Sequence, residues 1–114
     1  MFVAGEMAEK ITLPVLDPEG FLVDLNNWSP EVAKLLAAQD KIQLTPEHLD
    51  IILLLRDFYQ TYKLSPAMRP LTKYLRQHLA AEKTSSIYLM QLFGQSPAKA
   101  LARYAGLPKP DNCL

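Results

Sequence analysis

The stretch TPEHLDIILLLRDFYQTY, residues 45–62, decides the fold because its apolar side chains do not keep to one narrow helical stripe. They are Leu49, Ile52, Leu53, Leu55, Phe58, Tyr59 and Tyr62. A helix that is apolar on more than one face is buried by its neighbours. The sequence therefore predicts a central helix from Pro46 to Tyr62 that anchors the core.

The start of this helix, a hydroxyl residue followed by proline, recurs along the chain. The pairs are Ser29-Pro30, Thr45-Pro46, Ser65-Pro66 and Ser96-Pro97. A capping hydroxyl accepts from a free backbone N–H, and proline is tolerated in the first turn. A fifth start at Thr84-Ser85-Ser86 leads into an apolar run that ends near Gly94. The pattern predicts a bundle of about five helices.

Three features shape the second half of the bundle. Pro70 lies inside the pattern opened by Pro66, so we expect a kink or a later helix start there. The last helix, Pro97 to Ala105, is expected to stop at Gly106. Residues 107–114 then form an extended, flexible arm.

The β signal is confined to the amino-terminal part. Asp17-Pro18-Glu19-Gly20 has turn residues between two apolar runs within Ile11 to Asp24, which predicts an antiparallel hairpin. We expect an α+β fold that is mainly helical. The single domain 1–114 would divide into a β-rich part (1–28), a helical part (29–106) and the arm (107–114).

Composition narrows the class of protein. The 114 residues are 49% hydrophobic and 21% charged, as expected for one domain with an ordinary core. The longest aliphatic run, Ile51 to Leu55, is far below the roughly 20 residues of a membrane span, and no signal peptide is apparent. A cytoplasmic protein with no membrane contact is expected. His48 and His78 lack acids or cysteines at ligand spacing, so neither a metal nor a cofactor is expected.

Charge is unevenly distributed. Residues 1–62 carry ten acidic and four basic side chains, whereas residues 63–114 carry eight basic and two acidic ones. A basic half suits an acidic partner or a nucleic acid, and a solvated face balanced by the other half explains it equally well. Arg69, Lys73 and Arg76 on the second of two closely linked helices leave a helix-turn-helix DNA-binding regulator as an alternative.

Cys113 is the single cysteine, so the chain can form neither an internal disulfide nor a multi-cysteine metal site. It lies in the proline-containing arm, whose eight residues reach roughly 25 Å if fully extended. Such an arm can deliver a reactive thiol, although a frayed end with an incidental thiol gives the same pattern. Lys99, Arg103 and Lys109 could bind a partner or stabilise the thiolate, and solvated surface charge is their alternative role.

These residues resemble the TusE/DsrC family. The carboxy-terminal part of the chain contributes Ser96-Pro97-Ala98-Lys99, Ala105-Gly106-Leu107-Pro108-Lys109-Pro110 and Cys113. Matching internal motifs occur in the same order: Gly20-Phe21-Leu22, Trp28-Ser29, Leu44-Thr45-Pro46-Glu47-His48, Arg56-Asp57-Phe58-Tyr59 and Ser65-Pro66-Ala67-Met68-Arg69. The resemblance runs from about residue 12 to residue 114 and implies a small β-meander packed on a helical bundle.

The resemblance also implies a function. In TusE-like members the cysteine next to the last residue accepts persulfide sulfur from an upstream TusBCD-like relay complex. It passes the sulfur to an MnmA-like thiouridylase for 2-thiolation of the tRNA wobble uridine, which allows an indirect contact with tRNA. Cys113 would take this role. In DsrC-like members a second cysteine lies eleven positions earlier, where this chain has Ala102. A DsrC-like accessory of dissimilatory sulfur metabolism without that cysteine is the alternative within the family.

Overall fold

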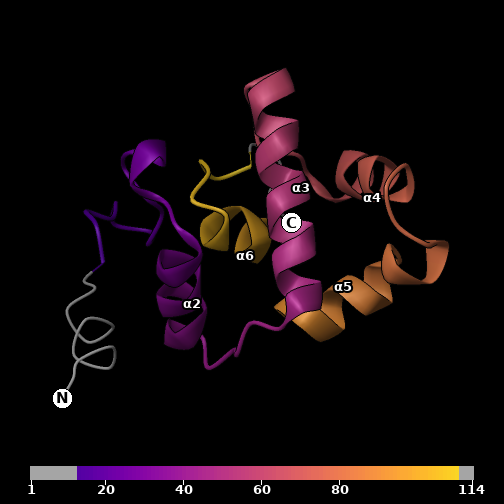
Figure 1. The fold of residues 1–114 in the computed structure, drawn as a ribbon, viewed down its shortest axis with the longest axis horizontal. Helices are drawn as coiled ribbons and strands as arrows, with labels where there is room; N and C mark the ends of the chain where they lie inside the picture. The colour runs from indigo at the N-terminus through magenta and orange to yellow at the C-terminus, as the bar shows by residue number, and fades with distance from the viewer. Residues whose placement is uncertain (1–12, 111–114) are drawn as a thin grey trace, which may run out of the picture.

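The computed structural model describes residues 13–110. Its α-helices are α2 (Pro30–Gln39), α3 (Pro46–Tyr62), α4 (Met68–Arg76), α5 (Ser86–Phe93) and α6 (Pro97–Tyr104), and two 3-10 turns are η1 (Leu25–Asn27) and η2 (Ala81–Lys83). Figure 1 shows α6 between α2 and α3, with α4 beyond α3 and α5 running from the lower end of α3 toward α4. The predicted, mainly helical bundle is confirmed.

The short helix α6 contacts each of the other four α-helices. Its Leu101, Ala102 and Tyr104 have no exposed surface. The longer helix α3 buries Ile51, Ile52, Leu55 and Phe58 among its residues, but Leu53 and Tyr62 lie about half exposed. The centre of the bundle is therefore shared between α3 and the last helix.

Three of the predicted helix starts have the expected caps. The hydroxyl of Ser29 accepts from the backbone N–H of Val32, and Ser85 accepts from Tyr88. Thr45 and His48 form a reciprocal capping box, in which Thr45 N–H donates to Nδ1 of the buried His48. The hydroxyl-proline pattern therefore marks real helix starts where the hydroxyl faces the first turn.

The cap predicted at Ser65 is wrong, and the later helix start expected from Pro70 is confirmed. Helix α4 begins at Met68, with Ala67 as a cap that makes no side-chain hydrogen bond. Pro70 then lies in the first turn, where a missing N–H costs no helical bond. Ser65 is buried, and its hydroxyl donates to the carbonyl of Pro108 instead.

The predicted β-rich part is not found in the described residues. Residues 13–28 contain one antiparallel bridge, Leu16 with Leu22, and no strand; residues 1–12 of that part lie outside the described range. The Asp17 carboxylate accepts from the backbone N–H groups of Glu19 and Phe21, which competes with strand pairing. Phe21 and Leu22 are both buried, and consecutive buried residues break the alternation of a strand. The segment wraps the helices as an irregular turn.

The arm does not leave the domain at residue 107. Leu107 is 2% exposed and Pro110 is buried, whereas Pro108 and Lys109 between them are exposed, and the carbonyl of Pro108 accepts from Ser65. The predicted thiol, Cys113, lies outside the described residues. No helix within residues 13–110 is long and apolar enough to cross a bilayer.

Candidate functional site

The segment of residues 104–110, which we call the arm root, begins with a tightly closed helix end. The N–H of Gly106 donates to the carbonyl of Arg103, and that of Leu107 donates to the carbonyl of Ala102. This Schellman closure requires a left-handed residue, and Gly106 has φ +74°. A Cβ here would lie 2.7 Å from Cδ1 of Trp28, so close packing demands glycine as well. The closure turns Leu107 into the core.

Three side chains from separate parts of the chain hold backbone carbonyls of the arm root. Nε1 of Trp28 donates to Tyr104 O at 2.8 Å, and Nη1 of Arg56 donates to Ala105 O at 2.5 Å. The hydroxyl of Ser65 donates to Pro108 O at 2.5 Å. The last carbonyls of a helix lack intrahelical donors, so the first two contacts also complete the end of α6.

Arg56 is the most elaborate of these holders. Its guanidinium carbon lies 4.2 Å from the centre of the Trp28 ring, within cation–π range. Partial burial lowers the pKa of Arg56, which nevertheless remains a cation because an arginine starts from so high a value. A positive charge at the carboxyl end of α6 also complements the helix dipole. Arg56 thus fixes both Trp28 and the arm root.

Long-range polar contacts concentrate on this segment. Among residues 13–110, all but one of the side-chain hydrogen bonds joining distant parts of the sequence end on residues 103–109. The exception joins His48 Nε2 to the carbonyl of Leu92. Apolar packing alone would leave a short helix free to shift, so these directional bonds fix where the arm begins.

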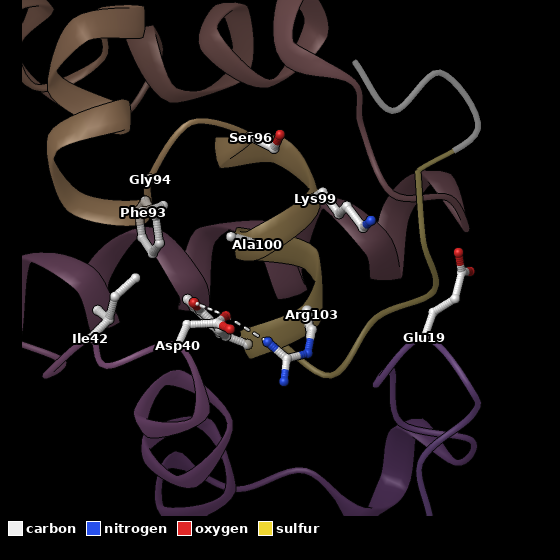
Figure 2. A pocket seen from close by; sticks show the side chains of 10 residues that line it. Glu19, Asp40, Ile42, Phe93, Gly94, Ser96, Lys99, Ala100 and Arg103 are labelled. Atoms are coloured by element: carbon white, nitrogen blue, oxygen red, sulfur yellow. Dashed lines mark hydrogen bonds and ion pairs between the residues drawn. The ribbon is translucent and has the colours of Figure 1, made fainter.

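A surface cavity of about 530 Å³ adjoins the arm root, and two of the predicted site residues line it. Lys99 and Arg103 come from successive turns of α6, and Figure 2 shows Arg103 beside Asp40, with Lys99 farther along the helix and Glu19 on the opposite side of Arg103 from Asp40. Lys109 pairs with Glu19 at 2.9 Å across this edge. The structure thus brings all three predicted basic residues to one side of the domain.

Arg103 is not available as a thiolate-stabilising group in this arrangement. Its guanidinium donates to the Asp40 carboxylate at 2.7 Å, to the Gly20 carbonyl at 3.1 Å and to the Gln39 amide oxygen. It therefore braces α6 against the end of α2 and the amino-terminal turn. Lys109 is also engaged within the domain, through its ion pair with Glu19. The roles of Lys99, Arg103 and Lys109 in partner binding or thiolate stabilisation stay predictions.

Tyr104 completes the bracing network. Its hydroxyl donates to the same Asp40 carboxylate at 2.6 Å, and its ring is fully buried. Burial, followed by the hydrogen bond to Asp40 and its negative charge, raises the pKa of Tyr104 well above its ordinary value. The phenol stays neutral and hydrogen-bonded throughout the physiological range.

Sequence reasoning missed the holders of the arm root. Trp28 and Arg56 lie within motifs that resemble the family, but their spacing gives no sign that they stack and point to the same helix end. Ser65 was assigned to a cap because it precedes proline. These roles depend on where the end of α6 comes to lie, and that position is set by tertiary packing.

Comparisons with known proteins agree with this arrangement. The family model described as "DsrC like protein" matches residues 9–114. A "Sulfurtransferase TusE homolog" of Haemophilus influenzae is 43% identical over 98 residues, which cover 86% of this chain and 90% of the relative. "Sulfurtransferase TusE" of Escherichia coli is 41% identical with the same coverage of both chains.

Solved structures give the same fold. The NMR structure of Allochromatium vinosum DsrC has a TM-score of 0.80 at 47% identity and covers 90% of this chain and 97% of its own. The oxidised gamma-subunit of the dissimilatory sulfite reductase (DsrC) from Archaeoglobus fulgidus has a TM-score of 0.74 at 40% identity, covering 89% and 92%. With a family model over most of the chain and relatives of this identity, the chain belongs to the DsrC-like protein family.

Proposed function

We propose that the chain is a sulfurtransferase of the TusE type, which carries sulfur on Cys113 toward the 2-thiolation of the tRNA wobble uridine. The observation that carries this proposal is the match to relatives named sulfurtransferase TusE over 98 residues. The single cysteine and the fixed arm root support it, since a carrier needs one transferable thiol and a defined point from which to present it.

The chemistry needs only exchange at sulfur. The Cys113 thiolate attacks the outer sulfur of a donor persulfide, the donor S–S bond breaks, and the donor leaves as a thiolate. Cys113 then holds Cys–S–SH, and an acceptor thiolate attacks its outer sulfur in the same way. Each step breaks one S–S bond and forms one, so no external oxidant or reductant is consumed. Neither a metal nor an organic cofactor takes part.

The partners that fit this role are a TusBCD-like relay complex as donor and an MnmA-like thiouridylase as acceptor. The relatives named sulfurtransferase TusE support a role in sulfur transfer between proteins. Lys99 supplies positive charge on the side of the arm root and would attract an acidic partner or favour the thiolate, and Lys109 would do so by exchanging its ion pair with Glu19 for the partner. Contact with tRNA would then be indirect, through the thiouridylase.

A second candidate within the family has its own support. The structural match to Allochromatium vinosum DsrC at 47% identity favours a DsrC-like accessory of dissimilatory sulfur metabolism. Ala102 argues against the two-cysteine cycle, because it offers a buried methyl group in place of the second thiol. The helix-turn-helix alternative has no support in these relatives, which are named for sulfur transfer or sulfite reduction.

The experiment is a sulfur-loading assay. The protein is incubated with a cysteine desulfurase, the relay complex and cysteine, and then measured by intact-mass spectrometry. We expect the mass of one sulfur atom to be added to the wild type and none to Cys113→Ser. Equal addition to both proteins would contradict the proposal. The loaded protein is then offered to both possible acceptors. Appearance of its sulfur in 2-thiouridine of tRNA supports the TusE-type carrier, and its use in a sulfite reductase reaction supports the DsrC-like accessory.

A further inference from the structure

The fixed arm root limits how far the thiol can travel. Three peptide units separate Cα of Pro110 from Cα of Cys113, and each spans at most about 3.6 Å. The Cα of Cys113 therefore stays within about 11 Å of Pro110, whatever conformation residues 111–113 adopt. The full reach of roughly 25 Å for eight free residues does not apply, because Leu107 and Pro110 are buried and Ser65 holds the carbonyl of Pro108.

This short reach brings any sulfur partner onto the domain surface. Sulfur exchange requires the two reacting sulfur atoms to touch. The partner's reacting cysteine must therefore come within about one side-chain length of the region, about 11 Å in radius around Pro110, that Cys113 can reach. A protein that encloses this cysteine will then contact the residues around the arm root. Donor and acceptor face the same restriction.

The surface on one side of the arm root combines exposed apolar side chains with charged ones. A depression of about 210 Å³ is lined by Lys63, Leu64, Ser65, Pro108 and Lys109. Leu64 is 52% exposed, and Tyr62, which ends α3, is 56% exposed. Exposed apolar side chains next to Lys63 and next to the ion pair of Lys109 with Glu19 favour a partner that offers apolar contacts and an acidic group for Lys63. Figure 1 shows the yellow arm root beside the carboxyl-terminal half of α3.

We propose that Tyr62, Lys63, Leu64, Pro108 and Lys109, the docking face, bind the sulfur donor and the sulfur acceptor in turn, each through an acidic and partly apolar rim. This inference rests on the proposed carrier function. It adds which surface binds the partners and that the donor must dissociate before the acceptor binds. Because the arm has one root and one short reach, the two partners compete for the docking face. The carrier must leave its donor before it reaches its acceptor.

The test uses matched pairs of substitutions at exposed positions. Leu64→Glu is paired with Ile87→Glu, since Ile87 is an aliphatic residue of α5 that is 69% exposed. Lys63→Glu is paired with Lys41→Glu, because both lysines are exposed and left-handed, with φ 59° and 62°. Lys41 precedes α3 and Lys63 follows it, so about 25 Å of helix separates them.

The dissociation constant of the full chain is measured for a TusBCD-like complex and for an MnmA-like thiouridylase from the same organism. We expect Leu64→Glu and Lys63→Glu to weaken both complexes about tenfold, and both controls to stay within about twofold. Adding the thiouridylase to the complex with the relay proteins should displace them without forming a ternary species. Melting temperatures of all four variants identify any loss of binding caused by unfolding.

Several outcomes would overturn the docking face. One is a stable ternary complex, and another is Leu64→Glu binding as tightly as Ile87→Glu. Loss of affinity for tRNA alone in Lys63→Glu, with both protein complexes unchanged, would assign this surface to RNA. Sulfur loading of Cys113 in the same samples separates the two proposals. Loading that continues while the face variants bind normally refutes the face and leaves the carrier, whereas wild type that neither binds nor loads refutes both.

Discussion

The carboxyl ends of α2 and α6 close with the same backbone geometry but use different residues. After α2, Lys41 has φ 62°, and the N–H of Ile42 donates to the carbonyl of Ala37. After α6, Gly106 has φ 74°, and the N–H of Leu107 donates to the carbonyl of Ala102. Both are Schellman closures, yet one position carries a long side chain and the other none.

The difference lies in what surrounds each closure. Lys41 is exposed, so its side chain extends into solvent and the cost is a modest backbone strain. Gly106 is buried beneath Trp28 and Leu22, where even a methyl group would overlap. A left-handed position therefore tolerates a side chain, while a left-handed position under a ring does not. The closure after α6, which leads into the arm, is therefore the one that does not tolerate a side chain at its left-handed position.

The largest expected effect comes from filling the closed position. Gly106→Ala should destabilise the protein by roughly 3 kcal/mol, through left-handed strain and overlap with Trp28. Lys41→Ala is the control and should change the free energy of unfolding by less than about 0.5 kcal/mol. Urea unfolding measures both. Equal effects at the two sites would contradict the argument that the packing around Gly106 sets it apart from Lys41.

Removing the charged holder should have the next largest effect. Arg56→Met keeps much of the side-chain volume but leaves Ala105 O without its donor and Trp28 without its cation, at a cost of about 2 kcal/mol. Arg69→Met on the exposed face of α4 should cost less than about 0.5 kcal/mol. Unfolding in guanidinium chloride and sulfur loading are measured for both variants. Comparable losses would show that the arm root does not depend on Arg56.

Tyr104, at the end of α6, makes the free energy of unfolding depend on pH. Its pKa is raised in the folded state, so the native protein holds this proton more tightly than the unfolded chain does. The resulting stabilisation is complete below the unfolded value of about 10 and is lost as pH rises above it. Tyr104→Phe should cost about 1 kcal/mol at pH 7 and flatten the alkaline decline. Unfolding curves between neutral pH and pH 11 test this, and an unchanged decline in the variant would assign it to other groups.

The smallest expected effect is a gain in stability at the solvent-exposed closure after α2. Lys41→Gly removes the left-handed strain, and the flexibility of glycine in the unfolded chain offsets part of that gain. We expect stabilisation of about 0.5 kcal/mol by thermal or urea unfolding. A loss of stability would show that the Lys41 side chain makes a contact that outweighs the strain.

The sequence was sufficient for features decided within a few residues. Ser29, Thr45 and Ser85 accept from the first turn, and Gly106 stops the last helix, because each of these choices depends on local backbone groups. The family was recognisable from short motifs for the same reason. Local patterns predict local outcomes.

Features decided by tertiary packing could not be predicted in this way. The amino-terminal segment has turn chemistry but buries both Phe21 and Leu22, because α6 passes beside it. Ser65 has cap chemistry but faces Pro108. The position of the last helix decides whether the amino-terminal segment forms strands and whether Ser65 caps a helix. Short sequence patterns do not predict that position.

The three holders of the arm root share one property: Trp28, Arg56 and Ser65 all donate to main-chain oxygens. A carbonyl group is the same in every amino acid, so these contacts impose little on the side chains beyond Gly106 and Leu107. The anchorage works as a socket for backbone, and the residues after Pro110 can change without rebuilding it. A grafted tail bearing a selenol, a fluorophore or a different nucleophile would start from the same point in space, which makes this domain a ready-made holder for other short, reactive peptides.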